Sequence, residues 1–249
     1  MNEHIMSRLQ GKTAVVTGGG TGIGFGAAKR FVDEGAFVYI FGRRQEQLDA
    51  AVAKLGSQAR AVRGSVTDLS DLDRLYETVR KERGTLDVLV ANAGTGLFAP
   101  LGEITVEHYD HIFDVNVKGL VFTVQKALPL MKQGASIILT GSSTGVMGTP
   151  QFSIYSATKA AIRNLARSWA QDLRGTGIRV NVLSPGPTKT ELALEIVGEE
   201  AFDSLGSSTP IGRVGDPSET GAVAAFLASS DSSYMTGGEV FVDGGLAQV

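Results

Sequence analysis

The sequence predicts an α/β domain built on one open, doubly wound parallel sheet. Short runs of β-branched and aromatic residues recur along the 249 residues, and segments with helical periodicity separate them. The strand candidates are continuous apolar runs without alternation, which is typical of a sheet covered by helices on both faces. Strand–helix alternation implies right-handed crossovers and parallel strands. No linker rich in proline or serine interrupts the pattern, so we expect residues 1–249 to form a single domain.

The predicted elements alternate along the chain. Strands are expected at residues 13–17, 37–41, 59–63, 88–91, 136–140, 179–183 and 239–242. The clearest helix lies between the third and fourth strands, over 69–80, where apolar residues from Leu72 to Val79 have i, i+3, i+4, i+7 spacing. Another helix carries Tyr155 and is expected to end near Leu173. Residues 190–215 contain no clear strand or long helix, and we interpret them as a substrate loop or lid.

Composition excludes several classes of function. Lys and Arg number 23 against 26 Asp and Glu, so nothing electrostatic indicates a nucleic acid or an anionic membrane as partner. The absence of cysteine excludes disulfides, thiolate catalysis and Cys-ligated metals. Residues 1–12 lack the apolar core of a secretory signal, and no apolar run approaches the ~18 residues of a membrane span. We expect a cytoplasmic protein that acts on a small molecule.

Glycine, at 32 residues, is concentrated directly after four of the predicted strands. Parallel strands end at one edge of the sheet, and ligands bind in the crevice beyond that edge. Glycine there lets the backbone approach a ligand closely. These glycines are Gly18, Gly19, Gly20, Gly22, Gly24 and Gly26 after the first strand, Gly94 and Gly96 after the fourth, Gly141, Gly145 and Gly148 after the fifth, and Gly186 after the sixth.

The first glycine group indicates a dinucleotide site. Thr17-Gly18-x-x-x-Gly22-Ile23-Gly24 lies where a strand turns into a helix, and the free N–H groups at a helix start can bind a pyrophosphate. It is a spacing variant of the G-x-G-x-x-G fingerprint. The sequence Gly11-Lys12-Thr13 resembles half of a P-loop, but that motif needs glycine at position 6, which is Met6.

The end of the second strand favours NADP(H) over NAD(H). A carboxylate there would bind the ribose 2′-OH of NAD, whereas arginine accommodates the 2′-phosphate of NADP. No acidic residue occurs from Ala36 to Arg44, and Gly42 is followed by Arg43 and Arg44. A guanidinium can bind phosphate in bidentate fashion. An ordinary solvated basic turn is the alternative.

Ser142, Tyr155 and Lys159 are the candidate catalytic residues. Tyr155 and Lys159 are four residues apart on one helix, so both side chains share a face. A nearby ammonium favours the phenolate and is expected to lower the pKa of Tyr155 toward the range useful for general acid–base catalysis. Ser142 follows the fifth strand and can hydrogen-bond a substrate oxygen.

Two other motifs do not lead to a site. Gly141-Ser142-Ser143-Thr144-Gly145 fits the G-x-S-x-G nucleophile elbow of hydrolases, but that triad needs a histidine after the serine. The three histidines, His4, His108 and His111, all precede it. His108-x-x-His111 lacks the accompanying ligands of zinc motifs, so no metal site is predicted.

Together these motifs resemble the short-chain dehydrogenase/reductase family from Lys12 to Gly245. The resemblance rests on the glycine loop, Asn92-Ala93-Gly94, Asn116, Ser142, Tyr155-x-x-x-Lys159, Pro185-Gly186 and Asp243-Gly244-Gly245. Within the family the chain looks most like bacterial NADP(H)-dependent carbonyl reductases and secondary-alcohol dehydrogenases. The resemblance implies a Rossmann-type sheet of about seven strands and a homotetramer.

The resemblance also implies a role for each matched position. Tyr155 would be the general acid in reduction, Lys159 would lower its pKa and bind the nicotinamide ribose, Ser142 would orient the carbonyl, and Asn116 would hold a water of a proton relay. The implied cofactor contacts are Gly18, Gly20, Thr21, Gly22, Ile23, Gly24, Gly42, Arg43, Arg44, Ser65, Val66, Asn92, Ala93, Gly94, Tyr155, Lys159, Pro185, Gly186, Thr188 and Thr190. Ser65 stands where the family often has an adenine-contacting aspartate, and Ala91 where a first asparagine is frequent.

Family geometry would place the substrate among loops that are mostly apolar. The candidate contacts are Gly96, Phe98, Thr144, Gln151, Phe152 and Leu192. This lining predicts a hydrophobic ketone or aldehyde. Two alternatives remain: a 3-oxoacyl-thioester reductase that acts on acyl-carrier protein, and a non-catalytic dinucleotide-binding regulator.

Overall fold

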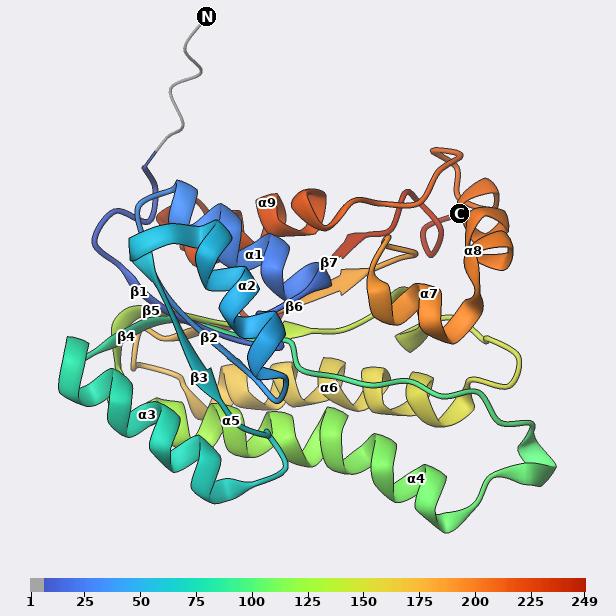
Figure 1. Ribbon diagram of the computed structural model, residues 1–249, viewed down its shortest axis with the longest axis horizontal. Helices are drawn as coiled ribbons and strands as arrows, with labels where there is room; N and C mark the ends of the chain where they lie inside the picture. The colour runs from blue at the N-terminus through green and yellow to red at the C-terminus, as the bar shows by residue number, and fades with distance from the viewer. Residues whose placement is uncertain (1–6) are drawn as a thin grey trace, which may run out of the picture.

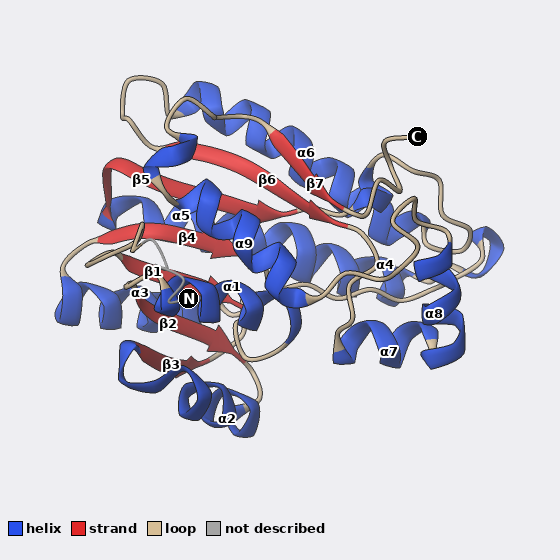
Figure 2. Ribbon diagram, turned by 90° about the horizontal axis from the view of Figure 1, so that it is seen from above, coloured by secondary structure: helices blue, strands red, loops and turns tan. Residues whose placement is uncertain are grey.

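The computed structural model describes residues 7–249, and within them seven parallel strands form one sheet (Figure 2). The strands are β1 Thr13–Thr17, β2 Phe37–Gly42, β3 Ala59–Arg63, β4 Leu86–Ala91, β5 Met131–Thr140, β6 Arg179–Pro185 and β7 Glu239–Val242. Their order across the sheet is β3-β2-β1-β4-β5-β6-β7, as predicted for a doubly wound fold. The predictions that concerned His4, Met6 and the first residues of the chain lie outside the described part.

Helices connect the strands in the predicted alternation. The α-helices are α1 Gly22–Asp33, α2 Gln45–Leu55, α3 Leu69–Arg83, α4 Val106–Phe113, α5 Gly119–Ala127, α6 Ser153–Asp172, α7 Glu191–Val197, α8 Glu199–Ser207 and α9 Pro217–Ala228. Short 3₁₀ turns are η1 Gly56–Gln58, η2 Leu101–Glu103, η4 Leu128–Leu130, η5 Ser143–Gly145 and η6 Ser230–Ser232, and η3 Asp114–Lys118 is a π-helical turn.

Capping side chains and a glycine with positive φ mark the ends of several helices. The Asp68 side chain caps α3 by accepting from the N–H groups of Ser70 and Asp71, and Gly84 ends that helix with φ of 75°. Asp216 and Glu219 form a capping box around Pro217 at the start of α9. These contacts fix where each helix begins and ends relative to the sheet.

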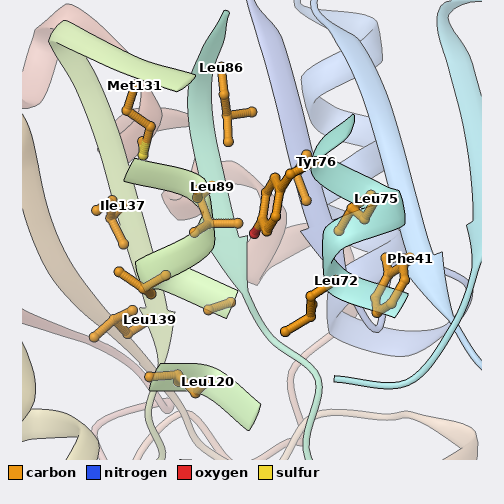
Figure 3. Close-up of a cluster of buried hydrophobic side chains, with 14 of the residues drawn as sticks. Phe41, Leu72, Leu75, Tyr76, Leu86, Leu89, Leu120, Met131, Ile137 and Leu139 are labelled. Atoms are coloured by element: carbon orange, nitrogen blue, oxygen red, sulfur yellow. The ribbon is translucent and has the colours of Figure 1, made fainter. Parts of the chain in front are cut away.

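The two sheet faces are covered by different helices, and a hydrophobic core lies on each side (Figure 1). α1, α2 and α9 pack on one face, with Phe31 and Leu48 fully buried beneath them. α3, α5 and α6 cover the other face, where Figure 3 shows Leu72, Leu75 and Tyr76 of α3 turned toward the strands. The Tyr76 hydroxyl remains satisfied in this core because it donates to the Thr123 carbonyl at 2.7 Å.

Four strands are longer than predicted. β2 ends at Gly42, β4 begins at Leu86, β5 begins at Met131, and β6 ends at Pro185. The start of β5 is paired through Met131 and Leu86, after which the register shifts. Residues 132–134 are exposed, so this part of the strand carries no apolar pattern from which it could be predicted.

The carboxyl ends of the strands meet at one edge of the sheet, and α7 and α8 lie beyond that edge (Figures 1 and 2). These two helices have seven and nine residues, which agrees with the prediction of no strand or long helix in residues 190–215. A parallel bridge between Thr188 and Gly215 closes the base of the segment. Among the described residues, no helix combines the length and apolar character needed to cross a membrane.

Candidate active site

Helix α6 places Tyr155 and Lys159 on one face, as predicted from their spacing. The Lys159 ammonium lies over the Tyr155 ring, 5.4 Å from its centroid. Lys159 is only 6% exposed, and its Nζ donates to the Thr140 carbonyl at 2.8 Å, which joins α6 to the end of β5. Ser142 lies two residues beyond that strand end and is also buried. The structure therefore brings together three groups from two separate elements.

The pKa of Tyr155 shifts in the direction opposite to the sequence prediction. Burial raises the pKa of the phenol above its ordinary value of 10.0, and a hydrogen bond from Ser142 opposes that change without reversing it. The prediction that Lys159 lowers this pKa is wrong for the described structure, because the ammonium faces the ring and donates to a backbone carbonyl. At neutral pH the phenol keeps its proton.

Desolvation lowers the pKa of Lys159 from 10.5 to about 8. Below pH 8 the Lys159 side chain is therefore a charged ammonium in both states. It is buried in the folded chain and hydrated in the unfolded chain. Since one pKa unit corresponds to about 1.4 kcal/mol, this protonation lowers the free energy of unfolding by about 3 kcal/mol at pH 7.

Replacing Lys159 with methionine should remove this pH dependence. The folded pKa is depressed, so the unfolded state binds more protons between pH 8 and 10.5, and stability of the native sequence rises with pH in that window. Chemical denaturation at pH 7 and at pH 10 measures the free energy of unfolding of the native chain and of Lys159→Met. The difference between these two free energies should be smaller at pH 10 than at pH 7. Replacing the exposed Lys132 with methionine is the control. If the difference in free energy of unfolding between the native chain and Lys159→Met does not change with pH, the lowered pKa of Lys159 is contradicted.

Asn116 lies in the π-helical turn η3 and connects the loop after β4 to α6. Its amide donates to the Thr95 carbonyl at 2.9 Å and to the Thr158 hydroxyl at 3.1 Å, and its side-chain oxygen accepts from the Thr95 N–H at 2.8 Å. A Cβ on Gly94 would lie 3.3 Å from Asn116 Oδ1 and 3.9 Å from Lys159 Nζ. Asn116 thus holds the Gly94 loop beside Lys159. Its hydrogen-bond partners, Thr95 in that loop and Thr158 on α6, were not indicated by any sequence motif.

The glycine loop after β1 packs too closely for side chains. A Cβ on Gly24 would lie 2.2 Å from the Gly18 carbonyl oxygen and 2.6 Å from Asn92 Nδ2. Gly18 and Gly22 have φ of 65° and 53°, which L side chains rarely adopt. Thr21, the N-cap of α1, makes no side-chain capping bond, so N–H groups at this helix start have no side-chain partner. These features fit a bound pyrophosphate; Gly20 lies in the turn before α1, and Ile23 lies in the first turn of the helix.

Asn92 and Ala93 anchor this loop through Thr17. The backbone N–H groups of Asn92 and Ala93 both donate to the Thr17 hydroxyl at 3.0 Å, and Asn92 Nδ2 donates to the Thr17 carbonyl at 3.0 Å. The Asn92 side chain is therefore occupied in joining β4 to β1. Thr17 has a positioning role that sequence reasoning did not assign to it.

The ends of β2 and β3 lie side by side at the same edge. Gly64 donates from its backbone N–H to the Gly42 carbonyl at 2.8 Å. Arg43 and Arg44 follow Gly42 and are exposed, and neither guanidinium pairs with a carboxylate among the side chains that the structure describes. After β3, Ser65 exchanges a hydroxyl hydrogen bond with Thr67 at 2.7 Å, and Val66 is buried. Two cations are thus available beside the predicted adenosine end of the site.

The segment after β6 reaches back to the glycine loop. Pro185 ends β6, and a Cβ on Gly186 would lie 2.6 Å from Asp243 Cα. The Thr188 hydroxyl donates to the Gly186 carbonyl at 3.0 Å. Thr190 caps α7 and lies against Gly22, where an added Cβ would be 2.9 Å from its methyl group. The start of the predicted lid therefore contacts the start of α1.

An aromatic stack begins at the Tyr155 ring. The Phe152 ring lies 4.3 Å from the Tyr155 ring and 4.4 Å from the Phe98 ring, between centroids, in two stacked pairs. Gly96 leaves space for the Phe152 ring, because a Cβ on Gly96 would lie 2.9 Å from Phe152 Cζ. Gln151, with φ of 60°, is the one non-glycine residue with positive φ in residues 7–249, and its carbonyl accepts from Ala99.

The two remaining predicted substrate contacts, Thr144 and Leu192, lie on different elements. Thr144 hydrogen-bonds Ser142 at 3.0 Å and so belongs to the catalytic cluster. Leu192 is 44% exposed on α7, in the segment predicted as a lid. His108 and His111 both lie on α4, and no group of three or more potential metal ligands occurs in the described part of the chain.

Comparison with known proteins gives the family of this chain. Residues 18–247 match the family model described as Enoyl-(Acyl carrier protein) reductase. The chain is 64% identical to oxidoreductase asL5 of Sarocladium schorii over 98% of this chain and 99% of that protein. It is 36% identical to the NADP-dependent (R)-specific alcohol dehydrogenase of Lentilactobacillus kefiri, covering 96% and 97% of the two chains.

A solved structure agrees with these sequence matches. The 3-ketoacyl-(acyl-carrier-protein) reductase of Brucella melitensis, in complex with NADH, superposes with a TM-score of 0.89 at 31% identity, covering 96% of this chain and 99% of that one. The chain belongs to the short-chain dehydrogenase/reductase family. It is an oxidoreductase with a Rossmann-like sheet, and its cofactor is a nicotinamide dinucleotide.

Proposed function

We propose that this short-chain dehydrogenase/reductase uses NADP(H) to interconvert a hydrophobic ketone or aldehyde and the corresponding alcohol. The observation that carries the proposal is the convergence of Ser142, Tyr155 and Lys159 at the carboxyl edge of the sheet, beside the glycine loop. A protein that only bound a dinucleotide would not need this cluster, which argues against a non-catalytic regulator.

In this proposal Tyr155 is the general acid of carbonyl reduction. When bound, the reduced nicotinamide supplies a hydride to the carbonyl carbon. Tyr155 donates its proton to the carbonyl oxygen, which Ser142 holds by a hydrogen bond. Burial keeps the phenol protonated at neutral pH, which is the state that reduction requires. Lys159 binds the nicotinamide ribose, and Asn116 holds a water of the path that returns a proton to Tyr155.

The cofactor-binding residues in this proposal are those at the same sheet edge. The glycine loop from Gly18 to Gly24 takes the pyrophosphate. Ser65 and Val66 contact adenine, Asn92, Ala93 and Gly94 line the adenosine ribose side, and Pro185, Gly186, Thr188 and Thr190 flank the nicotinamide.

Apolar surface beside Tyr155 supports a hydrophobic substrate. Phe98 is 42% exposed at the outer end of the aromatic stack, and the neighbouring Leu97 is 45% exposed. Large apolar side chains are rarely left exposed together unless they contact another apolar group. A planar aryl or alkyl ketone would cover these rings, whereas a sugar would leave its hydroxyls unpaired against them.

Following NADPH absorbance with a panel of carbonyls tests the proposal. Aryl and alkyl ketones should be reduced, and polyols or sugars should not be substrates in either direction. Activity confined to sugars and polyols would contradict it, as would NADPH binding without turnover of any carbonyl.

Arg43 and Arg44 support NADP(H), since both are exposed cations without a carboxylate partner in the described residues, beside a strand end without a carboxylate. Arg43→Ala should weaken NADPH binding roughly tenfold to hundredfold, because a charge-assisted hydrogen bond contributes about 1.5–3 kcal/mol. NADH binding should change less than about twofold, because NADH has no 2′-phosphate to pair with the lost guanidinium. Cofactor fluorescence titration measures both affinities, and Arg80→Ala, on the exposed surface of α3, is the control. Equal loss for the two cofactors would refute this assignment.

Reduction of 3-oxoacyl thioesters is the second candidate. It is favoured by the description of the matched family model and by the Brucella reductase. Acetoacetyl and longer 3-oxoacyl groups on acyl-carrier protein and on coenzyme A separate the two candidates. A strong preference for the carrier-bound thioester over simple ketones would favour the second.

We further propose a single cytoplasmic domain that assembles as a homotetramer without nucleic acid or membrane partners. Light scattering coupled to gel filtration measures the subunit number. A monomer at micromolar concentration would contradict this assembly.

A further inference from the structure

Ser142 is held by Thr144 in a way that fixes which hydrogen bond its hydroxyl can make. The Ser142 Oγ accepts from the Thr144 backbone N–H at 3.3 Å and from the Thr144 hydroxyl at 3.0 Å. A serine hydroxyl has two lone pairs and one proton. Both lone pairs are therefore occupied by one residue, and only the proton remains for another partner.

The remaining proton of Ser142 is directed at the Tyr155 phenol. A hydrogen bond between Ser142 and Tyr155 lowers the pKa of the phenol. Because both lone pairs of Ser142 Oγ accept from Thr144, the serine proton is the group left to make this bond. The order of donation is therefore Thr144 to Ser142 to Tyr155. Hydroxyls that donate in sequence polarise one another, so each donation strengthens the next.

Local backbone structure keeps Thr144 in place. The 3₁₀ turn η5 is closed by the Gly145 N–H, which donates to the Ser142 carbonyl at 3.0 Å. Gly145 also packs on α6, since an added Cβ would lie 3.2 Å from the Lys159 carbonyl carbon. Thr144 is thus fixed relative to both Ser142 and the helix that carries Tyr155.

We propose that Thr144 is a positioning residue that makes Ser142 an obligatory hydrogen-bond donor to the oxygen at the reacting centre. This inference rests on the proposed carbonyl reductase function. When the carbonyl oxygen of a substrate is present, it accepts the proton that Ser142 otherwise gives to Tyr155. Without the Thr144 hydroxyl, Ser142 can rotate its proton toward other acceptors, and the carbonyl is held less often in the reactive position.

Thr144→Val tests the inference because valine keeps the branched shape and removes the hydroxyl. We expect kcat for ketone reduction to fall about tenfold, the effect of about 1.4 kcal/mol for one lost hydrogen bond. Thr144→Ser keeps the hydroxyl and should retain kcat within about twofold. Ser143→Ala removes the adjacent hydroxyl, leaves both bonds from Thr144 in place, and controls for disturbance of the turn.

The pH profile distinguishes positioning from loss of structure. Weaker donation from Ser142 raises the pKa of Tyr155 further in the free enzyme, and the pH dependence of kcat/KM reports that state. The rise of kcat/KM for alcohol oxidation should therefore move to higher pH in Thr144→Val and return in Thr144→Ser. A Thr144→Val enzyme with the native kcat and pH profile would overturn the inference. So would a faster variant, because that result means Ser142 donates to Thr144 in the native enzyme.

A spectroscopic measurement separates this inference from the proposed function. In protein labelled with [¹³Cζ]tyrosine, the Tyr155 resonance is assigned by its absence from Tyr155→Phe, and its shift reports hydrogen bonding at the phenol oxygen. It should move in Thr144→Val and not in Thr144→Ser. If the native chain reduces no carbonyl, the proposed function fails while this shift still decides the role of Thr144. An unchanged Tyr155 resonance in Thr144→Val refutes that role.

Discussion

Tyr155→Phe is expected to lower kcat for ketone reduction by about 10³-fold, within the range by which a positioned general acid accelerates proton transfer. The substitution removes one oxygen atom and leaves the ring stacked on Phe152 at the same 4.3 Å centroid distance. Lys159 also keeps its bond to the Thr140 carbonyl, which does not involve the phenol. The protein should therefore fold and bind NADPH with nearly native affinity.

Steady-state kinetics and cofactor titration on the same preparation measure these two effects. Tyr109→Phe is the matched control, because Tyr109 is a half-exposed tyrosine on α4 that stacks on Phe113. Its kcat should be native. Turnover retained by Tyr155→Phe would eliminate Tyr155 as the proton donor, whatever cofactor is used.

Gly24→Ala is expected to lower the free energy of unfolding by about 3 kcal/mol, at the upper end of the usual cost of overpacking. The new methyl group would overlap the Gly18 carbonyl oxygen at 2.2 Å and the Asn92 amide at 2.6 Å. Neither neighbour can move freely: the first is backbone, and the second is bonded to Thr17. The loop after β1 must separate from α1, so cofactor affinity should fall together with stability.

Gly20→Ala provides the comparison within the same loop. Its Cβ would meet Leu48 Cδ2 at 3.5 Å, an ordinary contact, and its backbone does not have positive φ. Chemical denaturation should show this variant within about 1 kcal/mol of the native chain, as expected for a substitution without a steric conflict. Equal stability of the two variants would show that close packing at Gly24 is not required.

Strand positions followed from the local sequence pattern, and the differences between predicted and observed bounds lie at strand ends. β1, β3 and β7 have the predicted bounds, and β2 extends one residue further, to Gly42. The early part of β5 could not be predicted, since residues 132–134 are exposed and carry no apolar signal. The pairing of Met131 with Leu86 that makes it a strand is a contact between segments 45 residues apart.

The candidate site was predictable in its residue types and less so in its interactions. Spacing on one helix placed Tyr155 and Lys159 together, and the structure agrees. The hydroxyl and amide connections through Thr17, Thr95 and Thr158 depend on segments distant in sequence, so no motif contained them.

The sequence by itself determined the parallel sheet, the family and the identity of the groups at the sheet edge, because apolar periodicity, glycine placement and side-chain chemistry are local properties. Only the tertiary structure decided how those groups behave. Burial raises the pKa of Tyr155 and lowers that of Lys159 to about 8, since desolvation disfavours whichever form is charged. Burial and hydrogen-bond direction arise from packing between separate elements, and a linear sequence does not specify either one.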